Sequence, residues 1–215
     1  MVVKKDTFKF WKIDLDGEFV EEKETNLFGE IELESFIESS DKMGYLLYGK
    51  LDSKAFIAKY DGNLNLVWIK TYEDMKTVKE LIDEYEAGYY GIVETEDAYK
   101  LIKFDTEGNA ISVIKEDFNT STNPHLLHGE DSYLVYGYTT DVKINNSNSG
   151  SYFIIRYNLV DTVLWETIGE EPVDENKLIK LNETNHNYYL LHTNSNDNSI
   201  EVSRIDLDGV VVEKV

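Results

Sequence analysis

One arrangement of apolar and polar residues recurs five times along the chain. Each copy has apolar residues, a basic residue, an aromatic residue or isoleucine, and then aspartate or asparagine. The copies are Phe10–Asp14, Ile57–Asp61, Leu101–Asp105, Ile154–Asn158 and Val202–Asp206. A turn signal, usually with glycine, and a second apolar run follow each copy, as in Leu64–Trp68. Two apolar runs joined by a short turn predict a β-hairpin.

A second pair of apolar runs lies between successive hairpins. The first run of this pair is Ile31–Ile37, with counterparts at Val78–Ile82, Leu126–Leu127 and Lys177–Leu181. The second run begins with a small or polar residue and tyrosine, at Gly44–Gly49, Gly88–Val93, Ser132–Gly137 and Asn187–Leu191. Each pair predicts two further strands, so a full repeat has four strands.

The repeat length indicates the architecture. The basic residues of the five hairpins stand at positions 12, 59, 103, 156 and 204, which are 47, 44, 53 and 48 residues apart. Four strands in this length is the size of one propeller blade. We therefore predict an all-β protein, a β-propeller of four-stranded antiparallel blades formed as one domain over residues 1–215. A β-solenoid, with shorter repeats, is the alternative.

The strand order leaves an imbalance at the N-terminus. The chain begins with the third and fourth strands of a repeat and continues with four complete repeats. Open strand edges invite association, so we expect the edges to be covered. The chain is then part of a larger propeller, or an incomplete five-unit ring with a reduced first unit, or a module that self-associates through its open edges. The longer third repeat contains a polar insertion, Asp141–Gly150, which predicts a surface loop.

The repeats also resemble a known group. Gly44-Tyr-Leu-Leu-Tyr-Gly, followed by Phe56-Ile-Ala-Lys-Tyr-Asp-Gly-Asn and Val67-Trp68, looks like the bacterial β-propeller repeat of exported and surface-attached proteins. The resemblance covers almost the whole chain and implies an extracellular or cell-surface location; otherwise the protein is cytoplasmic. No signal-like apolar stretch opens the sequence, so an exported protein would have been trimmed here. The tryptophan position holds Ser112, Glu21 and Glu213 in three units, and we expect those units to pack less well.

The amino-acid composition argues against several classes of binding partner and site. The formal charge is −21, from 42 acidic and 21 basic residues, which argues against nucleic acid and anionic membranes as partners. The absence of cysteine excludes disulfides, thiol catalysis and cysteine-based zinc sites. No apolar run approaches the length of a spanning helix, so we expect no membrane insertion.

Several polar groups are candidates for chemistry. The basic residue of each hairpin and the Asp or Asn two positions later share a strand face. We interpret them as recurring ion pairs between blades, with a ring lining a central channel as the alternative. Asp14–Glu18 and Asp206–Gly209 evoke calcium loops, but they lack the further ligands of an EF-hand and fit turn chemistry better. The four histidines, His125, His128, His186 and His192, are interpreted as scattered surface residues.

Acidic residues follow the fourth strand of each repeat. They include Glu73, Asp74, Glu116, Asp117, Glu170 and Glu171. If these loops leave one face of a propeller, they form an acidic rim that could bind a cation such as Ca²⁺ or a basic partner. A solvated loop surface is the alternative.

The sequence favours a non-catalytic scaffold or interaction module that binds a protein, a glycan or a cation through its face loops, with the 141–150 insertion as a contact. The alternative is a propeller-type glycoside hydrolase or lyase with paired carboxylates. No catalytic residue, cofactor site or metal site is assigned.

Overall fold

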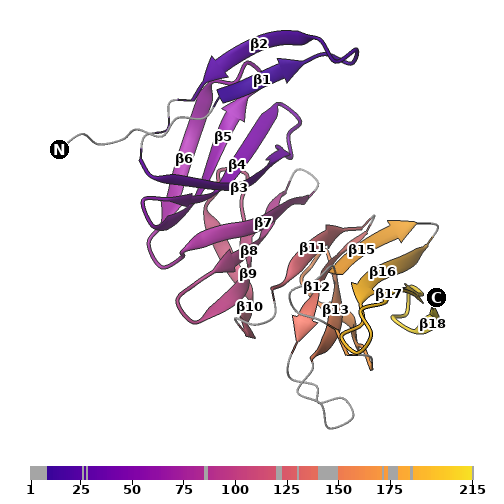
Figure 1. The fold of residues 1–215 in the computed structure, drawn as a ribbon. Coiled ribbons are helices and arrows are strands. Elements are labelled where there is room, and N and C mark those ends of the chain that lie inside the picture. The colour runs from indigo at the N-terminus through magenta and orange to yellow at the C-terminus, as the bar shows by residue number, and fades with distance from the viewer. Residues whose placement is uncertain are drawn as a thin grey trace. The chain divides into compact units, whose positions relative to one another are not determined.

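The computed structural model describes residues 9–25, 27, 29–84, 87–119, 123–129, 131–139, 150–170, 172–173, 179–184 and 186–214. These residues form eighteen strands and no helix (Figure 1). The strands are β1 (Lys9–Ile13), β2 (Phe19–Glu24), β3 (Ile31–Glu38), β4 (Gly44–Leu51), β5 (Lys54–Asp61), β6 (Leu66–Tyr72), β7 (Thr77–Glu84), β8 (Gly88–Glu94), β9 (Ala98–Phe104), β10 (Ala110–Asn119), β11 (His125–His128), β12 (Ser132–Thr139), β13 (Ser151–Asn158), β14 (Val163–Ile168), β15 (Ile179–Thr184), β16 (Asn187–Thr193), β17 (Ile200–Ile205) and β18 (Val211–Lys214).

The strands form the predicted repeats. Four consecutive sets, β3–β6, β7–β10, β11–β14 and β15–β18, each make a four-stranded sheet, and β1 and β2 make a separate hairpin. Neighbouring strands pair in an antiparallel manner, as in β4–β5 and β12–β13. The all-β prediction of four complete repeats preceded by a hairpin is therefore confirmed. The radial arrangement of a propeller stays a prediction.

The chain divides into two compact units. One contains residues 1–96 and 100–113, and the other contains residues 97–99 and 114–215. The single domain expected for residues 1–215 stays a prediction, and each unit is described by itself.

The hairpin turns explain the recurring Asp or Asn. In all five hairpins one side-chain oxygen of this residue accepts hydrogen bonds from the backbone amides two and four positions later, at 2.8–3.1 Å. The residues that accept these bonds are Asp14, Asp61, Asp105, Asn158 and Asp206. The residue three positions later has a positive φ, and glycine takes this place in three of the turns, as with Gly108 at +77°.

The interpretation of this basic residue and this Asp or Asn as ion pairs between blades is therefore wrong, because the Asp or Asn oxygen accepts hydrogen bonds from its own turn. In three sheets the basic residue instead bonds an acid located where the first two strands of its own sheet connect. The pairs are Lys59 with Asp41, Lys103 with Glu84 at 2.7 Å, and Arg156 with Asp131 at 3.0 Å. Each pair links the third strand of a sheet to the connection between the first two strands of the same sheet.

Apolar residues fill the space between neighbouring sheets within each unit. In the first unit, residues of β4 and β5 such as Leu46 and Ile57 pack against Leu81 and Phe104 of the next sheet. In the second unit, Tyr136 and Ile154 pack with Tyr188 and Leu190. Both clusters are almost fully buried, and burial of each large side chain contributes about 1.5–3 kcal/mol.

Two tryptophans bind the turn of the following sheet. Trp68 of β6 packs over Gly108, and Tyr72 of the same strand donates a hydrogen bond to the Gly108 carbonyl at 2.6 Å. In the second unit, Trp165 of β14 packs over Gly209 and donates to the Leu207 carbonyl at 2.7 Å. The tryptophan position therefore has the packing role that the repeat pattern indicated.

The Gly108→Ala substitution tests this contact. A methyl group there would lie 2.7 Å from the Trp68 ring, whereas Gly17 has nearly the same φ and nothing within 4 Å. We expect Gly17→Ala to cost about 1–2 kcal/mol of unfolding free energy from backbone strain. Gly108→Ala should cost about 1–3 kcal/mol more from the clash. Urea unfolding measures both, and equal losses would contradict the tight Trp68 contact.

Candidate functional site

The predicted acidic residues fall into three groups. Glu73 and Asp74 directly follow β6 and are exposed, and the Glu73 carboxylate binds the Lys54 ammonium at 2.6 Å. Glu170 follows β14 and is exposed. Glu171 and residues 141–149 of the insertion lie outside the described residues. The side chains of Glu116 and Asp117 also lie outside them.

Glu116 and Asp117 differ from the prediction in their position. They lie within β10 instead of after it, because the strand continues to residue 119. Phe118 in this extension is buried and stacks on Phe153 with ring centroids 5.8 Å apart. A common acidic rim therefore stays a prediction for Glu73, Asp74 and Glu170.

Metal and membrane sites receive no support from the described segments. These segments contain no group of three or more His, Asp or Glu residues placed to hold a metal ion. They also contain no helix with the length and apolar character needed to cross a bilayer. Binding of Ca²⁺ stays a prediction.

The interpretation of all histidines as surface residues is wrong for one of them. His192 of β16 is fully buried, with its ring 5.3 Å from the ring of Tyr152. His125 and His128 of β11 are partly buried, and the His125 ring lies 5.3 Å from Tyr136. These contacts belong to packing within the second unit.

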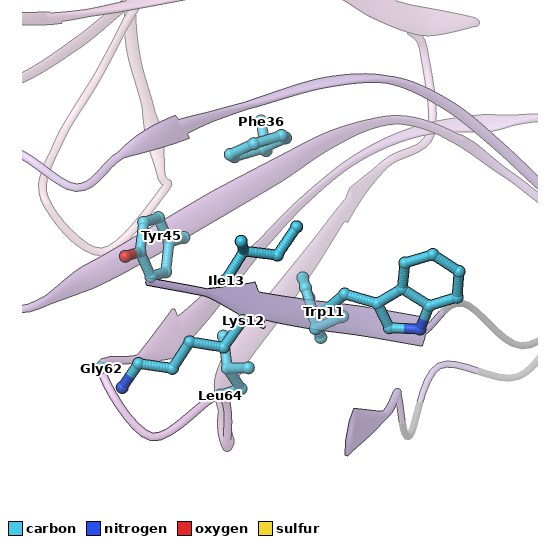
Figure 2. Close-up of a pocket in the computed structure, with 8 residues that line it drawn as sticks. Trp11, Lys12, Ile13, Phe36, Tyr45, Gly62 and Leu64 are labelled. Atoms are coloured by element: carbon cyan, nitrogen blue, oxygen red, sulfur yellow. The ribbon is translucent and has the colours of Figure 1, made fainter. Parts of the chain in front are cut away.

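A groove of about 270 Å³ lies beside the N-terminal hairpin in the first unit. We call it the β1 groove. Its lining residues come from β1, from one position each in β3 and β4, and from the β5–β6 turn. They are Phe10, Trp11, Lys12, Ile13, Phe36, Tyr45, Gly62 and Leu64. Figure 2 shows Ile13 pointing to the side of β1 where Phe36 and Tyr45 lie.

The groove exposes large apolar side chains. Trp11 is 66% exposed, Phe36 62% and Ile13 57%. The rings of Phe36 and Tyr45 meet edge to face with centroids 6.4 Å apart. Adjacent exposed apolar groups of this kind mark interaction sites on soluble proteins. The groove is therefore the strongest candidate site in the described residues.

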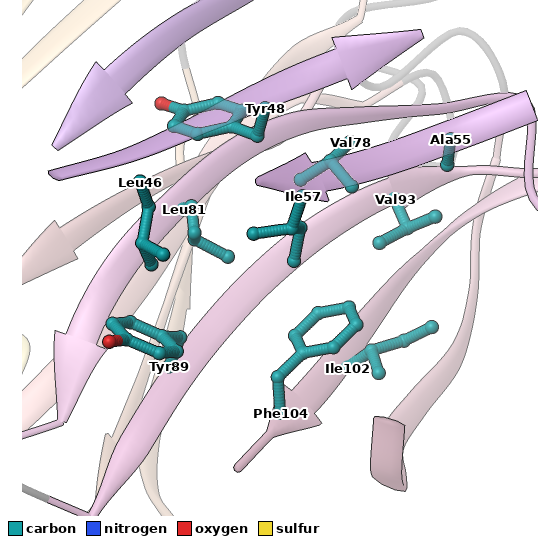
Figure 3. Packing of buried hydrophobic residues seen from close by; sticks show 10 residues of the cluster. All are labelled: Leu46, Tyr48, Ala55, Ile57, Val78, Leu81, Tyr89, Val93, Ile102 and Phe104. Atoms are coloured by element: carbon teal, nitrogen blue, oxygen red, sulfur yellow. The ribbon is translucent and has the colours of Figure 1, made fainter. Parts of the chain in front are cut away.

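Tyr45 is the exception among the recurring tyrosines. Its counterparts Tyr89, Tyr133 and Tyr188 are fully buried, whereas Tyr45 is 38% exposed. The hydroxyl of Tyr89 accepts hydrogen bonds from the backbone amide and hydroxyl of Ser40, in the turn that joins the first two strands of the preceding sheet. Figure 3 shows Tyr89 among the residues packed between the two sheets. Among the described residues, the strands before this sheet are only those of the β1–β2 hairpin, and the Tyr45 ring remains partly exposed.

Lys12 is the second exception. Its counterpart Lys59 binds Asp41, and this ammonium is the main reason that the pKa of the Asp41 carboxyl falls to about 2. Lys12 forms no ion pair with any described residue and lines the β1 groove, where it extends toward Gly62 and Leu64 in Figure 2. The groove therefore combines an apolar surface with one cation.

Sequence reasoning missed this site. Phe36 and Tyr45 occupy strand positions whose counterparts are core residues, so the repeat pattern does not mark them as a site. The available signal was that the first hairpin is not part of a four-stranded set among the described residues.

Comparisons with known proteins bear on the fold of this chain and give no information about its function. No protein-family model and no curated protein matches the sequence. A crystal structure of a protein of unknown function from Bacteroides caccae is similar, with a TM-score of 0.56 and 11% identity, over 94% of this chain and 73% of that chain. This likeness shows a shared fold. A crystal structure of a eukaryotic initiation factor matches with a TM-score of 0.44 and 10% identity, over 90% of this chain and 56% of that chain.

Proposed function

We propose that this chain is a non-catalytic interaction module, built on propeller-type repeats, that docks a protein segment in the β1 groove. The observation that carries the proposal is the gathering of exposed Ile13, Phe36 and Tyr45 around one groove. Burying such side chains against a partner removes apolar surface from water, which is the main favourable term in association. The resemblance to exported propeller repeats favours an extracellular or surface location for this binding.

The recurring polar residues support a scaffold role over catalysis. Asp61 and Asp105 accept hydrogen bonds from turn amides, and the Asp61 pKa is lowered, chiefly by the Asn65 side-chain donor. Lys103 and Arg156 bind acids of their own sheets. These groups are used to hold the strands in place.

A peptide-binding experiment tests the docking function. Random peptides displayed on phage are selected against the protein, and their dissociation constants are measured by fluorescence anisotropy. We expect peptides rich in apolar residues, and we expect Ile13→Ser or Phe36→Ser to weaken their binding by about tenfold. The matched control is Ile111→Ser, because Ile111 has the same 57% exposure as Ile13 and lies outside the groove. Equal losses with Ile111→Ser, or no enriched peptides, would contradict the proposal.

A further inference from the structure

We propose that Met75 is a reversible oxidation switch in the first unit, where hydrogen peroxide converts its thioether to a sulfoxide and loosens the packing between the sheets β3–β6 and β7–β10. The inference concerns a modification site and is independent of the docking function proposed above. It follows from the position of Met75 between β6 and β7, where the backbone passes from one sheet to the next.

The backbone around Met75 is bonded to both sheets. The Met75 carbonyl accepts a hydrogen bond from the Ala55 amide of β5 at 2.8 Å. The amide of the next residue, Lys76, donates to the Glu94 carbonyl of β8 at 2.8 Å. A shift of this connection therefore acts on the first sheet through β5 and on the second sheet through β8.

The side chain of Met75 packs on the apolar cluster that these two sheets share. The cluster contains Ala55 and Ile57 of the first sheet and Val78 and Val93 of the second, all fully buried (Figure 3). Met75 itself is partly buried, so it combines contact with this core and some contact with water. A thioether suits an apolar core, whereas a sulfoxide is polar. Oxidation would place a polar group against the cluster, and a polar group buried without a hydrogen bond destabilises the folded state.

The modification is a two-electron oxygen transfer from hydrogen peroxide. A lone pair of the Met75 sulfur attacks one peroxide oxygen, an S–O bond forms as the O–O bond breaks, and the other oxygen leaves as water after proton transfer. The sulfur is oxidised and the peroxide is reduced, and methionine sulfoxide reductases reverse the reaction with a thiol as the reductant. The chain has no cysteine to compete for the oxidant, and its formal charge of −21 favours a neutral peroxide over anionic oxidants.

Met43 provides the comparison within the same unit. It lies in the connection between β3 and β4 and is 73% exposed. The remaining methionine, Met1, lies outside the described residues. We expect peroxide to oxidise Met43 at least as fast as Met75, because susceptibility follows exposure. The Met43 sulfoxide would lie in water and leave the packing between the sheets unchanged.

Peroxide treatment of the full chain tests the switch. Mass spectrometry of proteolytic peptides measures the sulfoxide at each methionine, and urea unfolding followed by circular dichroism measures stability. At the urea midpoint of each untreated protein, we expect oxidation to raise the ratio of unfolded to folded protein about tenfold in the wild type and in Met43→Leu, and to leave Met75→Leu unchanged. Leucine replaces a core methionine at little cost. Methionine sulfoxide reductases should restore the original midpoint of the oxidised wild type, a measurement that needs no variant.

Hydrogen exchange locates the loosening within the molecule. We expect exchange of the Ala55 and Lys76 amides to become about tenfold faster on oxidation, because both bond at the Met75 connection. The amide of Asn158, which donates to the Thr162 carbonyl in the second unit, should be unchanged. The proposal would be overturned by a Met75 sulfoxide without faster exchange at these two amides, by an equal loss of stability in oxidised Met75→Leu, or by complete resistance of Met75 to peroxide.

Discussion

Replacing Phe104 with alanine is expected to lower the free energy of unfolding of the first unit by about 3–5 kcal/mol. Phe104 ends β9 and is fully buried in the cluster between two sheets, where its ring lies 5.4 Å from that of Tyr72 (Figure 3). The substitution removes an aromatic ring from a close-packed interior and leaves a cavity that the surrounding sheets fill only in part. Urea unfolding followed by circular dichroism measures the loss.

Phe36→Ala is the matched control for this substitution. Phe36 lies in the same unit and is also a strand residue, but its side chain is 62% exposed in the β1 groove. We expect the control to change stability by less than about 0.5–1 kcal/mol, as for most surface substitutions. The same variant should weaken peptide binding. A large stability loss with Phe36→Ala would mean that this ring belongs to the core and that the groove is not a binding surface.

The sequence was informative where the structure is local. The apolar runs and the turn signals predicted the strands, and the spacing of the basic residues at 59, 103 and 156 predicted repeats of four strands. These features depend on neighbours within about fifty residues. They were confirmed because each sheet is formed from consecutive strands.

The sequence was misleading where the chemistry depends on which groups meet. Asp61 follows Lys59 at a spacing that suggests an ion pair, yet its carboxylate is held by the amides of Asn63 and Asn65. The lysine reaches across a strand to Asp41, which lies 18 residues earlier. A pattern within one strand does not show this partner, because it depends on the register of β4 on β5.

The pattern of residues did not identify the candidate site for a related reason. Tyr45 and Tyr89 have the same repeat position and similar neighbours in the sequence, but one is exposed and the other is buried. The difference comes from the preceding unit, which is a hairpin before Tyr45 and a complete sheet before Tyr89. The exposure of the tyrosine at this repeat position therefore depends on whether the preceding strands form a complete sheet.

A second large effect is expected for Lys103→Met, which should lower the free energy of unfolding by about 3–5 kcal/mol. Lys103 of β9 donates to the Glu84 carboxylate at 2.7 Å, and Tyr90 donates to the same oxygen at 2.7 Å. The Glu84 side chain is only 7% exposed. Removal of the ammonium leaves a buried carboxylate with one remaining donor at that oxygen, and the loss of its charge partner is costly in a poorly solvated position.

Lys54→Met provides the comparison for an exposed ion pair. The Lys54 ammonium lies 2.6 Å from the Glu73 carboxylate, a shorter contact than that of Lys103, but the Glu73 side chain is 74% exposed. Water and salt screen this pair, so we expect a change of about 0–1 kcal/mol.

Thermal and urea unfolding of both variants, with Lys103→Met/Glu84→Gln as a third, measure the difference. The third variant should recover part of the loss, because the neutral amide removes the uncompensated charge. Equal stability of the two single variants would show that Glu84 is solvated in solution, and the stabilising role of this kind of pair in the three sheets that have it would then have to be abandoned.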